Sequence, residues 1–359
     1  MRLPDIAIHR LHSHHLTGPS LPSPVRVAEW LGAVQSQDYP GAKWALGLRS
    51  AGATDAVIDA AFDAGEILRT HVMRPTWHFV LPADIRWLLG LTGPRVHATI
   101  GSYYRKHELD GPLFVRSQQL IADALGGGVQ LTRNELATAL ARGGIEASGN
   151  RLAFIVMRAE LDALICSGAR RGRQFTYALL DERVPAGRPF DREAALAELT
   201  HRYFTSHGPA TMHDFAWWSG LTMADVRAGL DMVGSRLESE TIDDRTWWFG
   251  TRAPTRRTTT SHGVRLLPNY DEHIVAYRDH APSLHPDLRR PLDPGDDSLN
   301  AHIIVKDGLV IGGWRRTVQK KQVIVKTRPL VPLDLAGRAE LEAAAASYAR
   351  FLGLAVKLE

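Results

Sequence analysis

One order of predicted elements occurs twice along the chain and limits the possible folds: helix, helix, longer helix and hairpin. In the first copy, Thr132 and Glu135 form a capping-box pattern that begins a helix. A longer helix is predicted near 151–163, and the alternation over 174–179 favours one strand of a hairpin. This order is typical of a winged helix-turn-helix unit.

The second copy begins with an amphipathic helix over 193–206. A short helix through Trp217 and Trp218 follows, and Thr222 is the expected cap of the next helix. A hairpin is predicted over 237–249. The two copies, which lie about 60 residues apart, indicate an internal structural repeat.

The two ends of the chain have different patterns. Helices over 25–34 and 56–64 and a strand pair over 68–80 are compatible with a third copy at the N-terminus. From about residue 263 the pattern changes to strands, with an Asp307-Gly308 hairpin turn and a final helix over 336–352.

A chain of 359 residues is too long for one small core. We therefore expect an α+β fold of tandem winged helix-turn-helix units, three if the N-terminal copy is included, with a C-terminal β-rich subdomain. The expected boundaries are 1–120, 121–188, 189–262 and 263–359.

The balance of charges favours a polyanionic partner. The net charge is +4, and only seven of the 43 basic residues other than histidine are lysine. The arginine guanidinium is a planar fork suited to phosphates and base edges. A GC-rich genome would produce the same excess of arginine, so the bias alone does not establish DNA binding.

Several classes of site are disfavoured by the sequence. The single Cys166 excludes a disulfide framework and a cysteine-based zinc site. The histidines at 12, 14 and 15 and the run 271–273 lack a matching partner pattern for zinc. Gly126–Gly128 lacks the Lys-Ser/Thr of a phosphate loop. We therefore expect no metal and no cofactor.

The N-terminus has no signal-peptide core, and no run of 18 apolar residues occurs. The sequence thus predicts a cytoplasmic protein without a membrane partner.

Four stretches, in order along the chain, resemble motifs of one family, the AlkZ/YcaQ-like winged-helix DNA glycosylases of bacteria. They are 31–38 (LGAVQSQD), 69–78 (RTHVMRPTWH), 206–211 (SHGPAT) and 266–272 (LLPNYDE). The resemblance implies three tandem winged helices and excision of bulky alkylated bases.

The resemblance also implies site residues. Gln35 and Gln37 match the Gln-x-Gln form of the family's catalytic element, although Ser36 replaces the usual apolar residue between them. Thr255, Arg256 and Arg257 match a basic hairpin that reaches the DNA groove.

The chemistry of two glutamines limits the substrate. An amide cannot act as a strong general base, but its carbonyl can bind and orient a water molecule. An N7- or N3-alkylated purine is cationic, and its glycosidic bond breaks through an oxocarbenium-like state. Positioning a water molecule is therefore enough to promote hydrolysis of such a base. Residues i and i+2 of a helix face nearly opposite sides. Pro40 disfavours helical geometry at Tyr39, so the helix is expected to end near Gln37, where fraying would let both amides face one cleft.

Other residues are weaker candidates. Asp38 is a possible water activator or electrostatic stabiliser, with a plain turn residue as the alternative. Further DNA contacts are predicted in the first hairpin and in a second basic cluster, at Arg74, His78, Arg315, Arg316, Lys320 and Lys321. The paired tryptophans 217–218 and 247–248 are predicted to be core residues.

The sequence thus favours a monofunctional, monomeric DNA glycosylase that acts on double-stranded DNA containing bulky or cross-linked N7/N3-alkylpurines, in base excision repair or self-resistance. The alternative is a non-catalytic winged-helix protein, either a regulator or a lesion shield. Preference for one undamaged sequence over alkylated DNA would distinguish this alternative.

Overall fold

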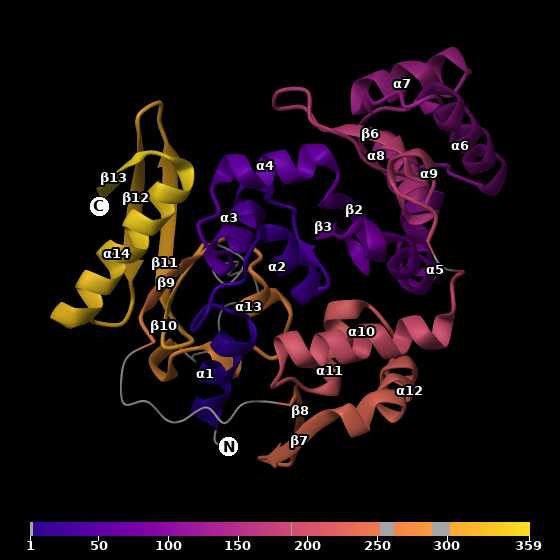
Figure 1. Ribbon diagram of the computed structural model, residues 1–359. Helices are drawn as coiled ribbons and strands as arrows, with labels where there is room; N and C mark the ends of the chain where they lie inside the picture. Colours follow the sequence, from indigo (N-terminus) through magenta and orange to yellow (C-terminus); the bar gives the residue numbers. More distant parts are fainter. Residues whose placement is uncertain (1–2, 188, 252–261, 289–301) are drawn as a thin grey trace. The chain divides into compact units, whose positions relative to one another are not determined.

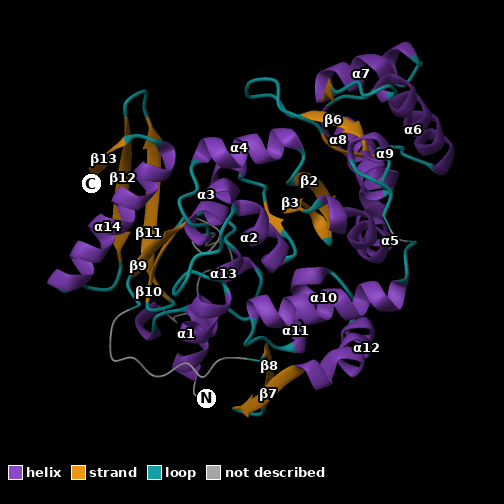
Figure 2. Ribbon diagram, viewed as in Figure 1, coloured by secondary structure: helices purple, strands orange, loops and turns teal. Residues whose placement is uncertain are grey.

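The computed structural model describes residues 3–187, 189–251, 262–288 and 302–359. The chain forms two compact units (Figure 1). The first comprises Met1–Asp59, Ala197–Trp218 and Thr222–Glu359, and the second comprises Ala60–Leu196 and Ser219–Leu221. Helices and strands occur in both units, so the expected α+β class is confirmed (Figure 2).

The N-terminal part of the first unit differs from the sequence prediction. α2 ends at Leu31 because Gly32 adopts a positive φ of 75°, and the chain continues as a two-residue strand, β1. Pro40 lies in the first turn of α3, where a missing N–H costs nothing, and so it begins a helix instead of ending one. The predicted helix over 25–34 is therefore too long. The elements are α1 (Leu3–Ser13), α2 (Pro24–Leu31), β1 (Val34–Gln35), α3 (Tyr39–Arg49) and α4 (Asp55–Ala64).

The middle of the chain follows the predicted order. Thr222 and Asp225 form a reciprocal capping box at the start of α12. Trp218 and Trp247 are buried as expected, but Trp217 is 48% exposed and does not belong to the core. The elements are α10 (Arg192–His207), α11 (Met212–Ser219), α12 (Met223–Val233), η1 (Gly234–Arg236), β7 (Leu237–Ile242) and β8 (Arg245–Gly250).

The C-terminal part of the first unit is a five-stranded sheet in the order β13-β12-β11-β10-β9. Neighbouring strands are antiparallel except β12 and β13, which are parallel. Asp307 and Gly308 have φ values of 51° and 82°, which confirms the predicted hairpin turn. The strands are β9 (Val264–Leu267), β10 (Ile303–Lys306), β11 (Leu309–Val318), β12 (Gln322–Pro329) and β13 (Ala355–Leu358); the helical segments are α13 (Glu272–Val275), η2 (Ala281–Ser283), η3 (Pro286–Leu288) and α14 (Leu335–Leu352).

The sheet and the N-terminal helices share one core. Leu11 of α1 packs in a buried apolar cluster with Leu267, Ile274 and Ile303. The Trp44 indole of α3 donates to the Leu266 carbonyl at 2.7 Å. These contacts join α3, which follows the Gln-Ser-Gln element, to strand β9.

The second unit begins with a hairpin and contains a further small sheet. Met73, at φ 63°, lies between β2 and β3, and Thr132 and Glu135 form the predicted capping box. The long helices α5 and α6 were not predicted. The elements are β2 (Leu68–Val72), β3 (Arg74–Val80), α5 (Pro82–Lys106), α6 (Gly111–Leu125), β4 (Leu131–Thr132), α7 (Arg133–Arg142), α8 (Gly149–Leu161), β5 (Ile165–Ser167), β6 (Thr176–Leu179) and α9 (Leu180–Arg183).

Among the described residues, no helix combines the length and the apolar character needed to cross a membrane.

The turn at Gly308 provides a test of the packing of α1 against the sheet. A Cβ at Gly308 would lie 2.6 Å from the Ala7 carbonyl oxygen, whereas a Cβ at Gly353, also at positive φ, meets no atom within 4 Å. We expect Gly353→Ala to lower the free energy of unfolding by about 1 kcal/mol and Gly308→Ala by about 2–4 kcal/mol. Urea unfolding measures both values, and equal losses would contradict the close approach.

Candidate active site

The two glutamines of the Gln-Ser-Gln element lie in different environments. Gln35 belongs to β1 and is only 8% exposed, Ser36 is fully buried, and Gln37 is exposed. β1 ends at Gln35, and Gln37 lies in a bend before α3. The backbone at Gln35 is therefore extended and not helical, so the opposite orientation of positions i and i+2 on a helix does not apply here.

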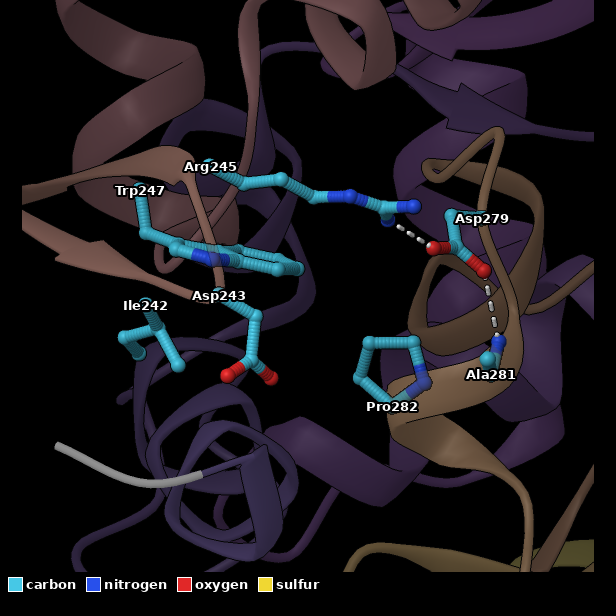
Figure 3. Close-up of a pocket in the computed structure, with 7 residues that line it drawn as sticks. All are labelled: Ile242, Asp243, Arg245, Trp247, Asp279, Ala281 and Pro282. Atoms are coloured by element: carbon cyan, nitrogen blue, oxygen red, sulfur yellow. Dashed lines mark hydrogen bonds and ion pairs between the residues drawn. The ribbon is translucent and has the colours of Figure 1, made fainter.

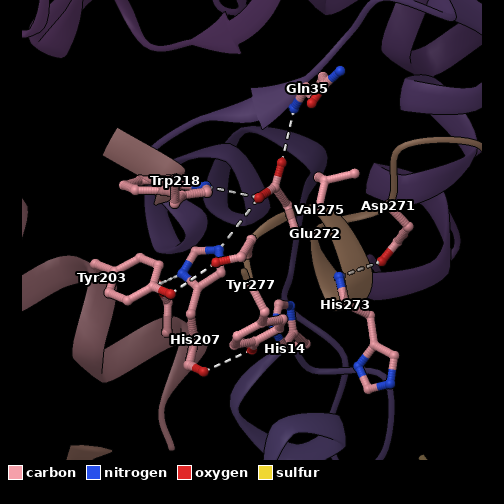
Figure 4. Close-up of polar contacts among 12 residues, drawn as sticks. His14, Gln35, Tyr203, His207, Trp218, Asp271, Glu272, His273, Val275 and Tyr277 are labelled. Atoms are coloured by element: carbon pink, nitrogen blue, oxygen red, sulfur yellow. Dashed lines mark hydrogen bonds and ion pairs between the residues drawn. The ribbon is translucent and has the colours of Figure 1, made fainter. Parts of the chain in front are cut away.

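Glu272 is the group that holds the backbone of Gln35. The Gln35 N–H donates to Glu272 Oε1 at 2.9 Å, and the Trp218 indole N–H donates to Oε2 at 2.9 Å (Figure 4). His207 Nε2 lies 3.5 Å from the same Oε2. All of these side chains except that of Gln35 are at most 1% exposed. The carboxylate therefore joins β1 to α11 and to the end of α10.

An ion pair positions the short helix that carries Glu272. Asp271 accepts from the His273 N–H at 2.9 Å and so caps α13. Its two carboxylate oxygens also accept from Arg49 at 2.9 and 2.7 Å. Arg49 donates further to the His14 carbonyl at 2.9 Å. The run 271–273 is thus occupied by structural contacts.

Three buried histidines surround this network. Burial lowers the pKa of His14 well below its usual value, and the nearby His207 lowers it further. Burial also lowers the pKa of His207, against the raising influence of Glu272. For His273, burial lowers the pKa to about 4. His14 is itself fully buried.

Asp38 and Arg316, two predicted site residues, bind each other. Arg316 Nη2 lies 2.9 Å from Asp38 Oδ2, and Nη1 donates to the Tyr348 hydroxyl at 3.0 Å. The Arg316 side chain is only 15% exposed. These contacts aim Arg316 at α3 and α14, away from a solvent-facing position for phosphate binding.

The other basic residues of the second cluster are exposed on the C-terminal sheet. Arg315 and Lys326 are directly opposite each other on β11 and β12, and Arg328 follows two residues on. Since Trp314 and Arg316 face Tyr348 of α14, strand alternation directs Arg315 to the opposite face. Lys326 and Arg328 were missed by the sequence analysis, although their alternation with Val325 and Thr327 is visible in the sequence. Lys320 and Lys321 are exposed where β11 and β12 meet.

Lys43 of α3 lies close in sequence to the Gln-Ser-Gln element, but two carboxylates bind its ammonium group. Its ammonium nitrogen is 2.7 Å from Asp55 and 2.8 Å from Asp59, and its side chain is 5% exposed. Tyr39 donates its hydroxyl to Asp59 at 2.9 Å.

The remaining predicted DNA contacts lie in the second unit or outside the described residues. In the second unit, Arg74 is half-buried and His78 is fully buried, with Nδ1 3.0 Å from the Thr76 carbonyl. Thr255, Arg256 and Arg257 lie outside the described residues.

A pocket of about 250 Å³ in the first unit does not contain a predicted site residue (Figure 3). The ion pair between Arg245 and Asp279, at 2.5 Å, spans one side of it. Within the described ranges, no group of three or more His, Cys, Asp or Glu side chains is placed to hold a metal ion.

The histidine environments predict how stability depends on pH. Burial lowers the pKa of His302 to about 4, and its Nδ1 accepts from the Asn269 N–H at 2.9 Å. A group whose pKa is lower in the folded state takes up a proton on unfolding as the pH falls below 6.5, so stability is lost from pH 6.5 toward pH 4. Each such histidine contributes up to about 1.4 kcal/mol per pH unit.

His302→Asn should make this dependence shallower by about one proton, because the carboxamide oxygen can replace Nδ1 as the acceptor without titrating. Denaturant unfolding at pH values from 4 to 7 measures the effect. An unchanged pH dependence would contradict the assignment.

Comparison with known proteins agrees with the motifs. Residues 28–351 match the family described as DNA glycosylase AlkZ-like. The "Interstrand DNA cross-link repair glycosylase" of Streptomyces sahachiroi is 24% identical over 331 residues, which cover 85% of each chain. The solved structure of Streptomyces sahachiroi DNA glycosylase AlkZ matches over 100% of both chains with a TM-score of 0.81 and 22% identity, so the fold is shared. Since the family match spans most of its length, this chain belongs to the AlkZ-like DNA glycosylase family.

Proposed function

We propose that this protein is a DNA glycosylase that hydrolyses the N-glycosidic bond of bulky or cross-linked N7/N3-alkylpurines in double-stranded DNA. Family membership supports a glycosylase, and the name of the Streptomyces relative supports cross-linked DNA as a substrate. The observation that carries the proposal is the position of Gln35, which lies in an extended, buried segment with Gln37 two residues on.

In this proposal Gln35 and Gln37 position the attacking water through their amide carbonyls. Burial of Gln35 strengthens its hydrogen bonds, because competing solvent is excluded. The leaving base supplies the driving force, since a cationic alkylpurine departs as a neutral molecule. Asp38 is occupied by Arg316, so its proposed part is electrostatic and not that of a general base.

The ion pairs of Lys43 support a monofunctional reaction. A lyase reaction requires a free amine that attacks the sugar. Asp55 and Asp59 bind the Lys43 ammonium group, so this lysine is not presented to a substrate. We infer that water is the nucleophile.

The proposed architecture retains three tandem winged helices, at 1–120, 121–188 and 189–262, before a β-rich subdomain at 263–359. Hairpins β2–β3, β5–β6 and β7–β8 would be the wings of the three proposed winged helices, in that order. Such an array grips DNA as a monomer without needing a second copy.

The proposed DNA surface is the exposed face of β11 and β12, with Arg315, Lys326 and Arg328, and the neighbouring Lys320 and Lys321. Like charges directly opposite each other on neighbouring strands are destabilising unless an anion screens them. The DNA backbone is a suitable anion. Arg74 and the 255–257 segment remain proposed contacts, whereas the burial of His78 and the ion pair of Arg316 favour structural roles.

The catalytic proposal predicts that Gln35→Ala and Gln37→Ala each lower the single-turnover rate of N7-methylguanine release by about 100-fold or more, because water is no longer oriented. Affinity for the same duplex should change by less than about twofold. A double variant that releases the base at the wild-type rate would refute the assignment. A wild-type protein that binds one undamaged sequence and releases no base would instead support the regulator alternative.

The surface proposal predicts that Lys326→Glu weakens binding to all DNA sequences. The negative slope of log K against log salt concentration should become less steep by about 0.9 for one lost phosphate contact. Arg338→Glu is the matched control, since Arg338 is exposed on α14, which covers the other face of the sheet. Fluorescence anisotropy at several salt concentrations measures both. Equal losses in the two variants would indicate a general charge effect.

A further inference from the structure

The carboxylate of Glu272 is a buried hub whose contacts end at the proposed catalytic element. Oε1 accepts from the backbone N–H of Gln35, and Oε2 accepts from the Trp218 indole, both at 2.9 Å (Figure 4). The side chain is 1% exposed. Charge-assisted hydrogen bonds of this kind are shorter and stronger than neutral ones. The position of Gln35 is therefore linked to α13, which lies 237 residues later in the sequence.

We propose that Glu272 is a positioning residue for glycosidic bond hydrolysis: it fixes the backbone of Gln35 so that the side-chain carbonyl of Gln35 holds the attacking water. This inference rests on the proposed function. Orientation of the water is all that an amide contributes, so a displacement of about 1 Å would cost about 100-fold in rate.

Glu272 is fixed in place by further buried contacts of its neighbours. Asp271 caps α13 and is bound through both carboxylate oxygens by Arg49, and both side chains are 1% exposed. Trp218 is fully buried on α11. Glu272 is thus held from its own helix and from the indole, and its hydrogen bond with the Gln35 N–H connects these contacts to β1.

Glu272→Gln tests the proposal with almost no change in volume. A carboxamide has one acceptor oxygen and one NH2 group, whereas both carboxylate oxygens of Glu272 receive an N–H. One of the two donors, Gln35 or Trp218, would then face another donor. If the amide rotates to satisfy the buried indole, the Gln35 N–H loses its acceptor on residue 272.

We expect Glu272→Gln to reduce the single-turnover rate of N7-methylguanine release at least tenfold, with duplex affinity within twofold. Hydrogen–deuterium exchange should be faster in peptides that span 33–38 and unchanged in those that span 303–310. Glu160→Gln is the matched control for neutralising a carboxylate of 1% exposure, here one bound to His71 in the second unit. It should leave the rate within about threefold, even where the melting temperature falls.

A double variant separates positioning from general stability. Trp218→Phe removes the indole donor, so in Trp218→Phe/Glu272→Gln the carboxamide oxygen can return to the Gln35 N–H while its NH2 group faces only His207 Nε2, which accepts a hydrogen bond in one neutral tautomer. Positioning predicts that the double variant releases the base faster than Glu272→Gln alone. A purely structural role predicts a further loss, because a large buried ring has been reduced.

The outcomes are distinct. A wild-type rate in Glu272→Gln, or a loss accompanied by faster exchange across 303–310, would overturn the positioning role. Absence of base release by the wild-type protein would refute the proposed function instead. In that case the exchange of 33–38 still reports whether Glu272 holds Gln35.

Discussion

The buried pair of Arg49 and Asp271 is the interaction on which the arrangement of the first unit depends. Removing two charges from water is expensive, and only the bidentate geometry and the additional hydrogen bonds of both partners offset that cost. A four-residue helix such as α13 has no stability of its own. It exists where it does because Asp271 is held from α3. Loss of either partner would leave an uncompensated buried charge at the centre of the network.

From that pair, a chain of contacts leads to the proposed chemistry. α13 presents Glu272, Glu272 holds the Gln35 N–H, and β1 is the extended segment that carries Gln35. The buried histidines beside it keep low pKa values, so they are neutral near pH 7 and add no positive charge to the network.

Strand alternation gives different surroundings to two arginines that are adjacent in the sequence. Arg316 is directed to Asp38 and Tyr348, whereas Arg315 is directed to the exposed face that it shares with Lys326. Both had been assigned to DNA because they form one basic run. The alternation of a strand gives each a different role, and one residue of register would exchange them.

Features that depend on neighbouring residues can be predicted without the structure. Capping boxes at Thr132 and Thr222, the Asp307-Gly308 turn and the order of helices and hairpins were all predictable, because neighbouring residues supply their hydrogen bonds and dihedral preferences. The motifs also indicated the family. The sequence also contains Gly32 and Pro40, but the predicted first helix continues past Gly32 and uses Pro40 as a stop signal. In the structure Gly32 ends α2 and Pro40 begins α3.

The surroundings of the two glutamines depend on contacts between distant parts of the chain. Gln35 is a strand residue bound by Glu272, Asp38 is paired with Arg316, and Lys43 is paired with Asp55 and Asp59. The contacts of Gln35 and Asp38 join residues 237 and 278 positions apart. No local pattern records such separations, because burial and the pairing of buried polar groups are settled by packing of the whole unit.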